Sequence, residues 1–279
     1  MRFALGCELN YTVIAPTTLI LNIEALRGPQ QRVLGESLVI TPGLLSEAHE
    51  AHETGNLYRR LLLQPGQYGI RYEATVETRP VVEDPGEVAE VPVSQLPLEV
   101  MPFLYPSRYC ESDRLGRFAW REFGGIATGH EKVTAVCNWI HDYVDYMAGS
   151  SHSATSAHDT FTERAGVCRD FAHLGISFCR ALGIPARFVS AYGWQLEPQD
   201  FHAVFEAYLG DRWYLFDATR LCPMDGIVRI GIGRDAADTA FATFYGQVQD
   251  APKSVWIEPV EGADASAEWT TEAVSVATV

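Results

Sequence analysis

The segment RAGVCRDFAHLGISFCRALGIP, which runs from Arg164 to Pro185, decides the fold of this chain. From Cys168 onward it is apolar on nearly all sides, a pattern that predicts a helix from Cys168 to Leu182 buried on most of its faces. Gly183 suits the position that follows a helix, and Pro185 prevents the helix from continuing. A cysteine is therefore expected at the first position of a buried helix.

This position makes Cys168 a candidate nucleophile. Unpaired N–H groups and the helix macrodipole place partial positive charge at a helix N-terminus. Both favour the thiolate, which is the nucleophilic form of the side chain. The other cysteines lack this placement, and those within predicted apolar helix faces are expected in the core: Cys137 and Cys179.

A hairpin further along the chain is expected to supply a base and an acid. Two apolar runs flank Gly210-Asp211, a plausible two-residue hairpin loop. In the register that this loop sets, His202 and Asp217 are diagonal neighbours on one face, with Cβ atoms about 7–8 Å apart or less. A one-residue slip would put the two side chains on opposite faces.

The chain order Cys168, His202, Asp217 is that of a nucleophile, a base and an orienting acid. A carboxylate that accepts from one imidazole nitrogen leaves the other nitrogen free to face a thiol. A structural thiol or metal site is a weaker interpretation, because the spacings match no compact ligand pattern. The sequence HEAHE at 49–53 lacks the helical histidine pair of zinc proteases and is interpreted as a solvated loop. We predict neither a metal ion nor a cofactor.

The rest of the chain divides into three parts. Residues 1–106 are expected to form a small β-sandwich-like domain that ends in a proline-rich linker at 80–106. Within it, residues 68–76 alternate apolar and polar side chains, the period of a half-buried strand. Residues 107–260 are expected to form the catalytic core, which includes an amphipathic helix from His130 to Tyr146. The tail at 261–279 has little periodicity and is either frayed or an edge strand.

Composition limits the classes of partner. With 36 acidic and 21 basic residues, the net charge of −15 disfavours binding to nucleic acids and to anionic membrane surfaces. The N-terminus lacks the features of a secretory signal peptide, so we expect a cytoplasmic protein whose cysteines remain thiols. Neither the substrate nor the oligomeric state can be deduced from the composition.

Three sequence blocks resemble the active-site blocks of bacterial transglutaminase-like proteins: RAGVCRDFAHL (164–174), DFHAVFE (200–206) and RWYLFDAT (212–219). The flanking segments PSRYCESDR (106–114) and CNWIHDYVDY (137–146) also resemble the pattern of that family. One departure is Ala218, where the family more often has proline. The resemblance spans roughly residues 1–250.

The resemblance implies an α+β fold with a papain-like, transglutaminase-like core. In this family Cys168 would attack a carbonyl group, His202 would transfer the proton and Asp217 would hold the imidazolium. The thioester that results would be resolved by water or by an amine. The backbone N–H of Cys168 and one further donor, with Tyr146 and Trp194 as candidates, would stabilise the oxyanion.

We therefore predict a cysteine peptidase or amidase that acts on a peptide or protein substrate. The main alternative is a transglutaminase, which differs in the acceptor that enters the thioester. A second alternative is a non-catalytic peptide-binding module that keeps the fold. The intact Cys168, His202 and Asp217 set argues against that module, because peptide binding does not require a nucleophile.

Overall fold

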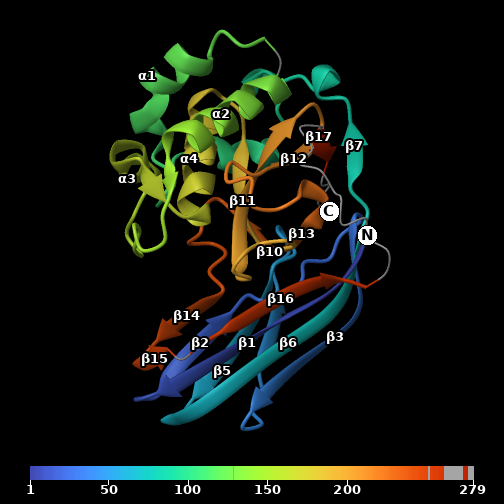
Figure 1. Ribbon diagram of the computed structural model, residues 1–279, viewed down its shortest axis with the longest axis vertical. Coiled ribbons are helices and arrows are strands. Elements are labelled where there is room, and N and C mark those ends of the chain that lie inside the picture. Colours follow the sequence, from blue (N-terminus) through green and yellow to red (C-terminus); the bar gives the residue numbers. More distant parts are fainter. Residues whose placement is uncertain (128, 251, 261–272, 276–279) are drawn as a thin grey trace.

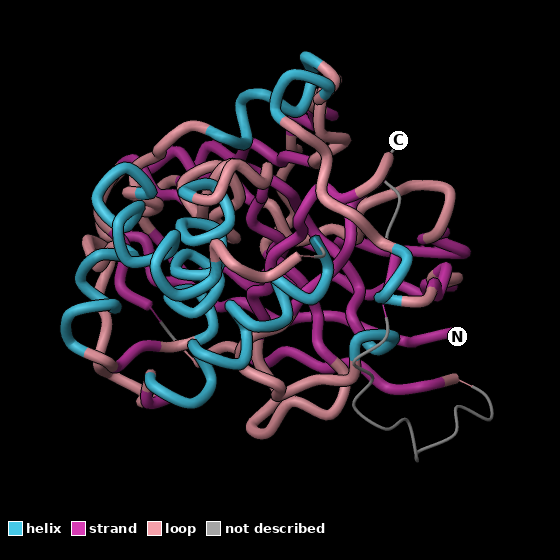
Figure 2. Tube along the Cα trace, turned by 90° about the horizontal axis from the view of Figure 1, so that it is seen from above, coloured by secondary structure: helices cyan, strands magenta, loops and turns pink. Residues whose placement is uncertain are grey.

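The computed structural model describes residues 1–127, 129–250, 252–260 and 273–275. Long strands of the N-terminal region occupy the lower part of Figure 1, and the helices with a second group of strands occupy the upper part. Figure 2, viewed from above, shows most of the helical segments gathered on one side of the strands. Among the described residues, no helix combines the length and the apolar character needed to cross a membrane.

The N-terminal part contains two antiparallel sheets. Their strands are β1 (Arg2–Val13), β2 (Thr17–Leu21), β3 (Gln31–Thr41), β4 (Glu47–Glu50), β5 (Leu57–Leu63), β6 (Gly66–Thr78), β14 (Ala242–Tyr245), β15 (Val248–Asp250) and β16 (Ser254–Pro259). One sheet has the order β15-β1-β6-β3, with β16 also paired to β1, and the other has the order β14-β2-β5-β4.

Strand β6 has the alternation that the sequence predicted. Ile70, Tyr72 and Val76 are buried, whereas Arg71 and Glu73 between them are exposed. Strand β4, in contrast, is exposed along its whole length and pairs with β5 as an edge strand. The interpretation of HEAHE as a solvated loop is confirmed for residues 51–53, which lie outside any strand, and is wrong for His49 and Glu50, which end this edge strand. An exposed edge strand has no buried face to produce an apolar alternation.

The chain returns to the N-terminal sheets before it ends. Strand β16 pairs with β1 from Phe3 to Glu8, and β14 pairs with β2. The predicted core, 107–260, thus includes strands that pair with the N-terminal part. Most of the predicted tail lies outside the described residues, but β17 (Ala273–Ser275) pairs with β12 (Arg212–Phe216) and β7 (Val81–Glu83).

The proline-rich linker forms short elements on the way to the core. These are the edge strand β7 and the 3-10 helices η1 (Pro85–Glu87), η2 (Val93–Gln95) and η3 (Leu98–Leu104). An edge strand or a short 3-10 helix can contain proline, because few of its backbone N–H groups need an acceptor within the same segment. The linker therefore contains neither a central strand nor a long helix.

The core consists of helices packed on a six-stranded sheet of order β13-β10-β11-β12-β17-β7. Strand β7 of this sheet comes from the linker, and β17 comes from the C-terminal tail. The remaining elements of the core are α1 (Ser112–Phe123), α2 (Gly129–Tyr143), β8 (Asp145–Tyr146), α3 (Ala157–Glu163), β9 (Ala165–Gly166), α4 (Cys168–Ala181), β10 (Ala186–Gly193), β11 (Phe201–Leu209), η4 (Met224–Gly226) and β13 (Ile227–Gly233). Helix α2 ends three residues before the predicted Tyr146, because Asp145 and Tyr146 pair with β9 instead.

Helix α4 and the β11–β12 hairpin form as the sequence predicts. Helix α4 begins at Cys168, and Gly183 beyond its end has φ +84°, a conformation that favours glycine. Leu209 pairs with Arg212 across the Gly210-Asp211 loop. The register on which the His202–Asp217 prediction depended is therefore confirmed.

The two parts share a hydrophobic core. Tyr192, Trp194 and Phe201 of the second part pack with the apolar side chains of the N-terminal sheets. The Tyr192 hydroxyl also donates a hydrogen bond to the Ile23 carbonyl at 2.8 Å. The N-terminal sheets are thereby held against the edge of the core at which β11 begins.

Candidate active site

Cys168 occupies the first position of α4 and is partly exposed, as is Arg169, whereas the side chains from Asp170 to Arg180 are buried. The Asp170 carboxylate accepts a hydrogen bond from the Val167 backbone N–H at 2.9 Å and fixes the start of the helix. Asp170 also pairs with Arg169 at 2.8 Å. Asp170 thus combines a salt bridge with a negative charge in the first turn of the helix, where the macrodipole favours an anion.

The imidazole of His202 and the carboxylate of Asp217 are in direct contact. His202 Nε2 lies 2.8 Å from Asp217 Oδ2, and both side chains are almost completely buried. The second carboxylate oxygen accepts hydrogen bonds from Thr219, from its backbone N–H at 2.8 Å and its hydroxyl at 2.7 Å. Sequence reasoning missed the role of Thr219, although its position two residues after the acid suits a local turn of this kind.

Charge and burial act in opposite directions on this pair. Burial lowers the pKa of His202, but the Asp217 carboxylate and the neighbouring Cys168 thiol outweigh burial and raise that pKa to about 10. Burial likewise raises the pKa of Asp217, but His202 and the Thr219 hydrogen bonds outweigh it and lower that pKa below 3.8. The pair is therefore an imidazolium and a carboxylate at neutral pH.

The second nitrogen of His202, Nδ1, is the one available to interact with Cys168. Nδ1 is buried, and no side chain or backbone group among the described residues lies in hydrogen-bonding geometry to it. Apart from Asp217, Cys168 is the side chain that raises the pKa of the imidazole. Since Nε2 is held by Asp217, Nδ1 is the nitrogen that remains for the thiol. The structure thus brings together all three predicted residues.

Of the two predicted oxyanion donors, only Tyr146 lies beside Cys168. Its hydroxyl interacts with both the backbone N–H and the thiol of Cys168, and burial together with that thiol raises the pKa of Tyr146. The hydroxyl therefore keeps its proton and can donate it in a hydrogen bond. Trp194 instead packs against Phe3 of β1, with ring centroids 5.9 Å apart.

A cavity of about 710 Å³ opens at the sulfur and the imidazole, and we call it the Cys168 cleft. It is lined by Leu9, Asn10, Tyr11, Tyr109, Ser153, Cys168, Arg169, Phe188, Ser190, Phe201, His202, Ala203, Ala236, Thr239, Ala240, Phe241, Ala242, Phe244, Pro252 and Lys253. The N-terminal sheets contribute Leu9, Asn10 and Tyr11 to its wall. Other lining residues come from the segments 236–244 and 252–253, which sequence reasoning did not connect with Cys168.

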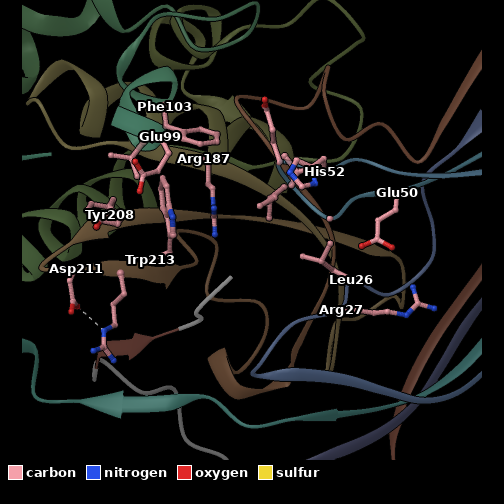
Figure 3. A pocket seen from close by; sticks show the side chains of 16 residues that line it. Leu26, Arg27, Glu50, His52, Glu99, Phe103, Arg187, Tyr208, Asp211 and Trp213 are labelled. Carbon is pink, nitrogen blue, oxygen red and sulfur yellow. Dashed lines mark hydrogen bonds and ion pairs between the residues drawn. The ribbon is translucent and has the colours of Figure 1, made fainter. Parts of the chain in front are cut away.

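A second cavity, of about 410 Å³, lies elsewhere and contains none of the three predicted site residues. Figure 3 shows the Arg187 guanidinium beside the Trp213 ring, with Glu99 and Tyr208 on one side and His52 and Glu50 on the other. The guanidinium carbon of Arg187 is 3.9 Å from the centroid of that ring. The aromatic wall of this cavity is thus already covered by a cation of the protein itself.

The remaining cysteines differ from Cys168 in their surroundings. All of them are buried. Burial raises the pKa of Cys7 to about 11 and that of Cys110 and Cys179 to about 12. Within the described part of the chain, no group of three or more His, Cys, Asp or Glu side chains is placed to hold a metal ion.

Comparisons with known proteins agree with this architecture. Residues 119–218 match the family described as the transglutaminase-like superfamily, and residues 1–99 match the bacterial transglutaminase N-terminal domain. The crystal structure of a candidate cysteine protease from Cytophaga hutchinsonii is similar over 99% of this chain and 97% of that chain, with 44% identity and a TM-score of 0.94. An uncharacterised Mycobacterium leprae protein is 34% identical over 128 residues, which are 41% of this chain and 45% of that protein. The chain thus spans about half the length of this curated relative.

Proposed function

Because the chain belongs to the transglutaminase-like superfamily, we propose that it is a cysteine peptidase or amidase that hydrolyses amide bonds through a thioester. Cys168 is the nucleophile, His202 the general acid and base, and Asp217 the residue that holds the imidazolium. The substrate is a peptide or protein segment bound in the Cys168 cleft.

One observation carries this proposal. A partly exposed sulfur at the head of α4 shares a cavity with an imidazole whose far nitrogen is held by a buried carboxylate at 2.8 Å. A cysteine that served only as a small apolar side chain would need neither the cavity nor the buried ion pair, since burying two charges costs several kcal/mol per ion before their attraction offsets it.

The reaction can be written from the imidazolium form of His202 and from the thiolate that a helix N-terminus favours. The Cys168 thiolate adds to the carbonyl carbon while the His202 imidazolium gives its proton to the departing nitrogen. The C–N bond breaks, an amine leaves and a thioester remains. Neutral His202 then removes a proton from water, which attacks the thioester carbon. Cleavage of the C–S bond releases the carboxylic acid and restores the thiolate and the imidazolium.

Tyr146 supports the charged intermediates of both steps. Its hydroxyl lies beside both the backbone N–H and the thiol of Cys168, so both donors would be within reach of an oxygen bound next to the sulfur. An oxygen that becomes negative there would receive both hydrogen bonds. Donors held in place before the reaction are among the largest contributions to acyl transfer.

Hydrolysis is favoured over transamidation by the similarity to the Cytophaga hutchinsonii protein, which is described as a candidate cysteine protease. The two reactions share the thioester and differ in the nucleophile that resolves it. A glutamine-containing peptide incubated with the protein, with and without a labelled primary amine, separates them. We expect mass spectrometry to find mainly hydrolysed product, and no product with Cys168→Ala. Incorporation of amine in excess of hydrolysis would make the protein a transglutaminase.

A further inference from the structure

The wall of the Cys168 cleft is predominantly aromatic and aliphatic. Phe201 and Phe241 stack with ring centroids 3.9 Å apart, and Tyr11 meets Phe244 edge to face at 4.9 Å. The Phe241 and Phe244 rings are partly exposed, so they present apolar area to the cavity. Covering such area removes it from water, and a large apolar side chain of the substrate would gain most from doing so.

Apart from the Cys168 and His202 pair, the charged side chains in this wall are all cationic, which is unexpected in so acidic a chain. Although the sequence has 36 acidic residues, no Asp or Glu among the described residues lines the cleft, whereas Arg169 and Lys253 do. Their carboxylate partners, Asp170 and Asp200, do not line the cleft. Each ion pair therefore turns its cationic end toward the substrate.

Both cations keep donors available. Arg169 uses Nε and Nη2 for Asp170, Ser151 and the His152 carbonyl, and its Nη1 makes no hydrogen bond within the described part of the chain. The Lys253 ammonium has three N–H donors; it contacts Asp200 Oδ1 at 2.6 Å and remains half exposed. An anionic group of the substrate can therefore bind either cation without displacing its partner.

The net charge of the chain points the other way, since −15 repels anions at long range. Fields from distant charges are screened within about 8 Å at physiological ionic strength, however. A bound ligand therefore responds chiefly to the charges that line the cleft, and there the cations dominate.

On the premise of the proposed peptidase activity, we infer that the Cys168 cleft selects peptides with a large apolar side chain and an acidic side chain next to each other near the reacting amide. Phe241, Phe244 and Phe201 would accept the apolar group, and Lys253 and Arg169 would bind the carboxylate.

Four internally quenched peptides test the inference. They share one Gly/Ser frame and differ at two adjacent positions, which are Asp-Phe, Lys-Phe, Asp-Ala and Lys-Ala. Binding is measured by fluorescence anisotropy with Cys168→Ala, which cannot form the thioester, and kcat/KM is measured with the unmodified protein. We expect Phe to be preferred over Ala about 10- to 100-fold. Asp should be preferred over Lys about 5- to 10-fold, and less so in 0.5 M NaCl.

Lys253→Glu should reverse the charge preference and leave the Phe preference unchanged. Arg117→Glu is the matched control, because it makes the same change of charge at an exposed site on α1 that does not line the cleft. It should keep the preference for Asp. The comparison of the four peptides needs no variant other than Cys168→Ala, so it remains informative if Lys253→Glu fails to fold.

The outcomes separate the inference from the proposed function. If Cys168→Ala binds the peptides in the expected order but the unmodified protein cleaves none of them, the peptidase proposal fails and the substrate class stands. If cleavage occurs with less than twofold differences, the substrate class is wrong and the peptidase proposal stands. Failure of Cys168→Ala to bind any of the four at millimolar concentration also overturns the substrate class.

Discussion

Replacement of Asp217 by asparagine tests the electrostatic role assigned to the buried pair. Asn has nearly the same shape as Asp, and its amide oxygen can still accept the two hydrogen bonds from Thr219 that Asp217 Oδ1 accepts. What the change removes is the negative charge 2.8 Å from His202 Nε2. The fold should therefore be kept while the imidazolium loses its partner.

The structure gives the size of the effect. The pKa of His202 is about 10, against an ordinary value of 6.5. At about 1.4 kcal/mol for each tenfold change in an equilibrium constant, this difference corresponds to about 5 kcal/mol. Breaking a buried ion pair by removing one partner costs about 3–5 kcal/mol, which is the same order. Without the carboxylate, burial remains and lowers the pKa of His202.

At pH 7.5 the imidazole of Asp217→Asn should thus be neutral, and the thiolate–imidazolium pair should be largely lost. We expect kcat/KM to fall by about 10³- to 10⁴-fold, the loss typical when the acid of such a triad becomes an amide. A profile of kcat/KM from pH 5 to pH 11 should have its alkaline limb near pH 10 in the unmodified protein, where the imidazolium loses its proton. In the variant this limb should move below pH 7.

Stability should follow the same titration. Because the pKa of His202 is raised on folding, its stabilising contribution is complete below about pH 6.5 and is lost as the pH rises through about 10. Urea unfolding between pH 7 and pH 10 should show this decline in the unmodified protein and not in Asp217→Asn. Asp211→Asn is the matched control, since it makes the same change in the exposed loop of the same hairpin. If Asp217→Asn keeps kcat/KM within tenfold and leaves the alkaline limb in place, the orienting role of Asp217 is wrong.

Three further predictions concern the nucleophile, the oxyanion and the core. At pH 6 and in excess iodoacetamide, Cys168 should be alkylated faster than free cysteine, while the buried cysteines remain unmodified. Peptide mass spectrometry measures the rate at each cysteine. A rate at Cys168 equal to or below that of free cysteine would favour a non-catalytic module. Tyr146→Phe should lower kcat about 10²-fold with little change in KM, because it removes one donor to the oxyanion; an unchanged kcat in steady-state assays would exclude that role. Glu206→Ala should lower the free energy of unfolding by about 3–5 kcal/mol in urea titrations, because it leaves two buried cations without their carboxylate. Glu206 is buried, at 2.5 Å from Arg187 and 3.3 Å from Arg229. A loss below 1 kcal/mol would mean that this network contributes little to stability.

Local sequence determined the elements that carry the candidate site. The start of α4 at Cys168 follows from a helix that is apolar on nearly every side and ends before Gly183. The register of the hairpin follows from the two-residue loop at Gly210-Asp211, because side-chain direction in a strand changes with every residue. These features depend on neighbours within a few residues, so their pattern can be interpreted without a structure.

Tertiary structure alone decided how those elements meet and what surrounds them. Residues 236–244 and 252–253 lie far along the chain from Cys168, and nothing in their own composition places them at its cavity. Strand β4 and the return of β14–β16 to the first sheets escaped prediction because an exposed edge and a long-range pairing leave no periodic pattern in the sequence. The same holds for the cleft, whose cationic lining in an acidic chain arises when distant segments converge. Short-range periodicity thus specifies helices, strands and registers, whereas the contacts that shape a cavity depend on the packing of the whole chain.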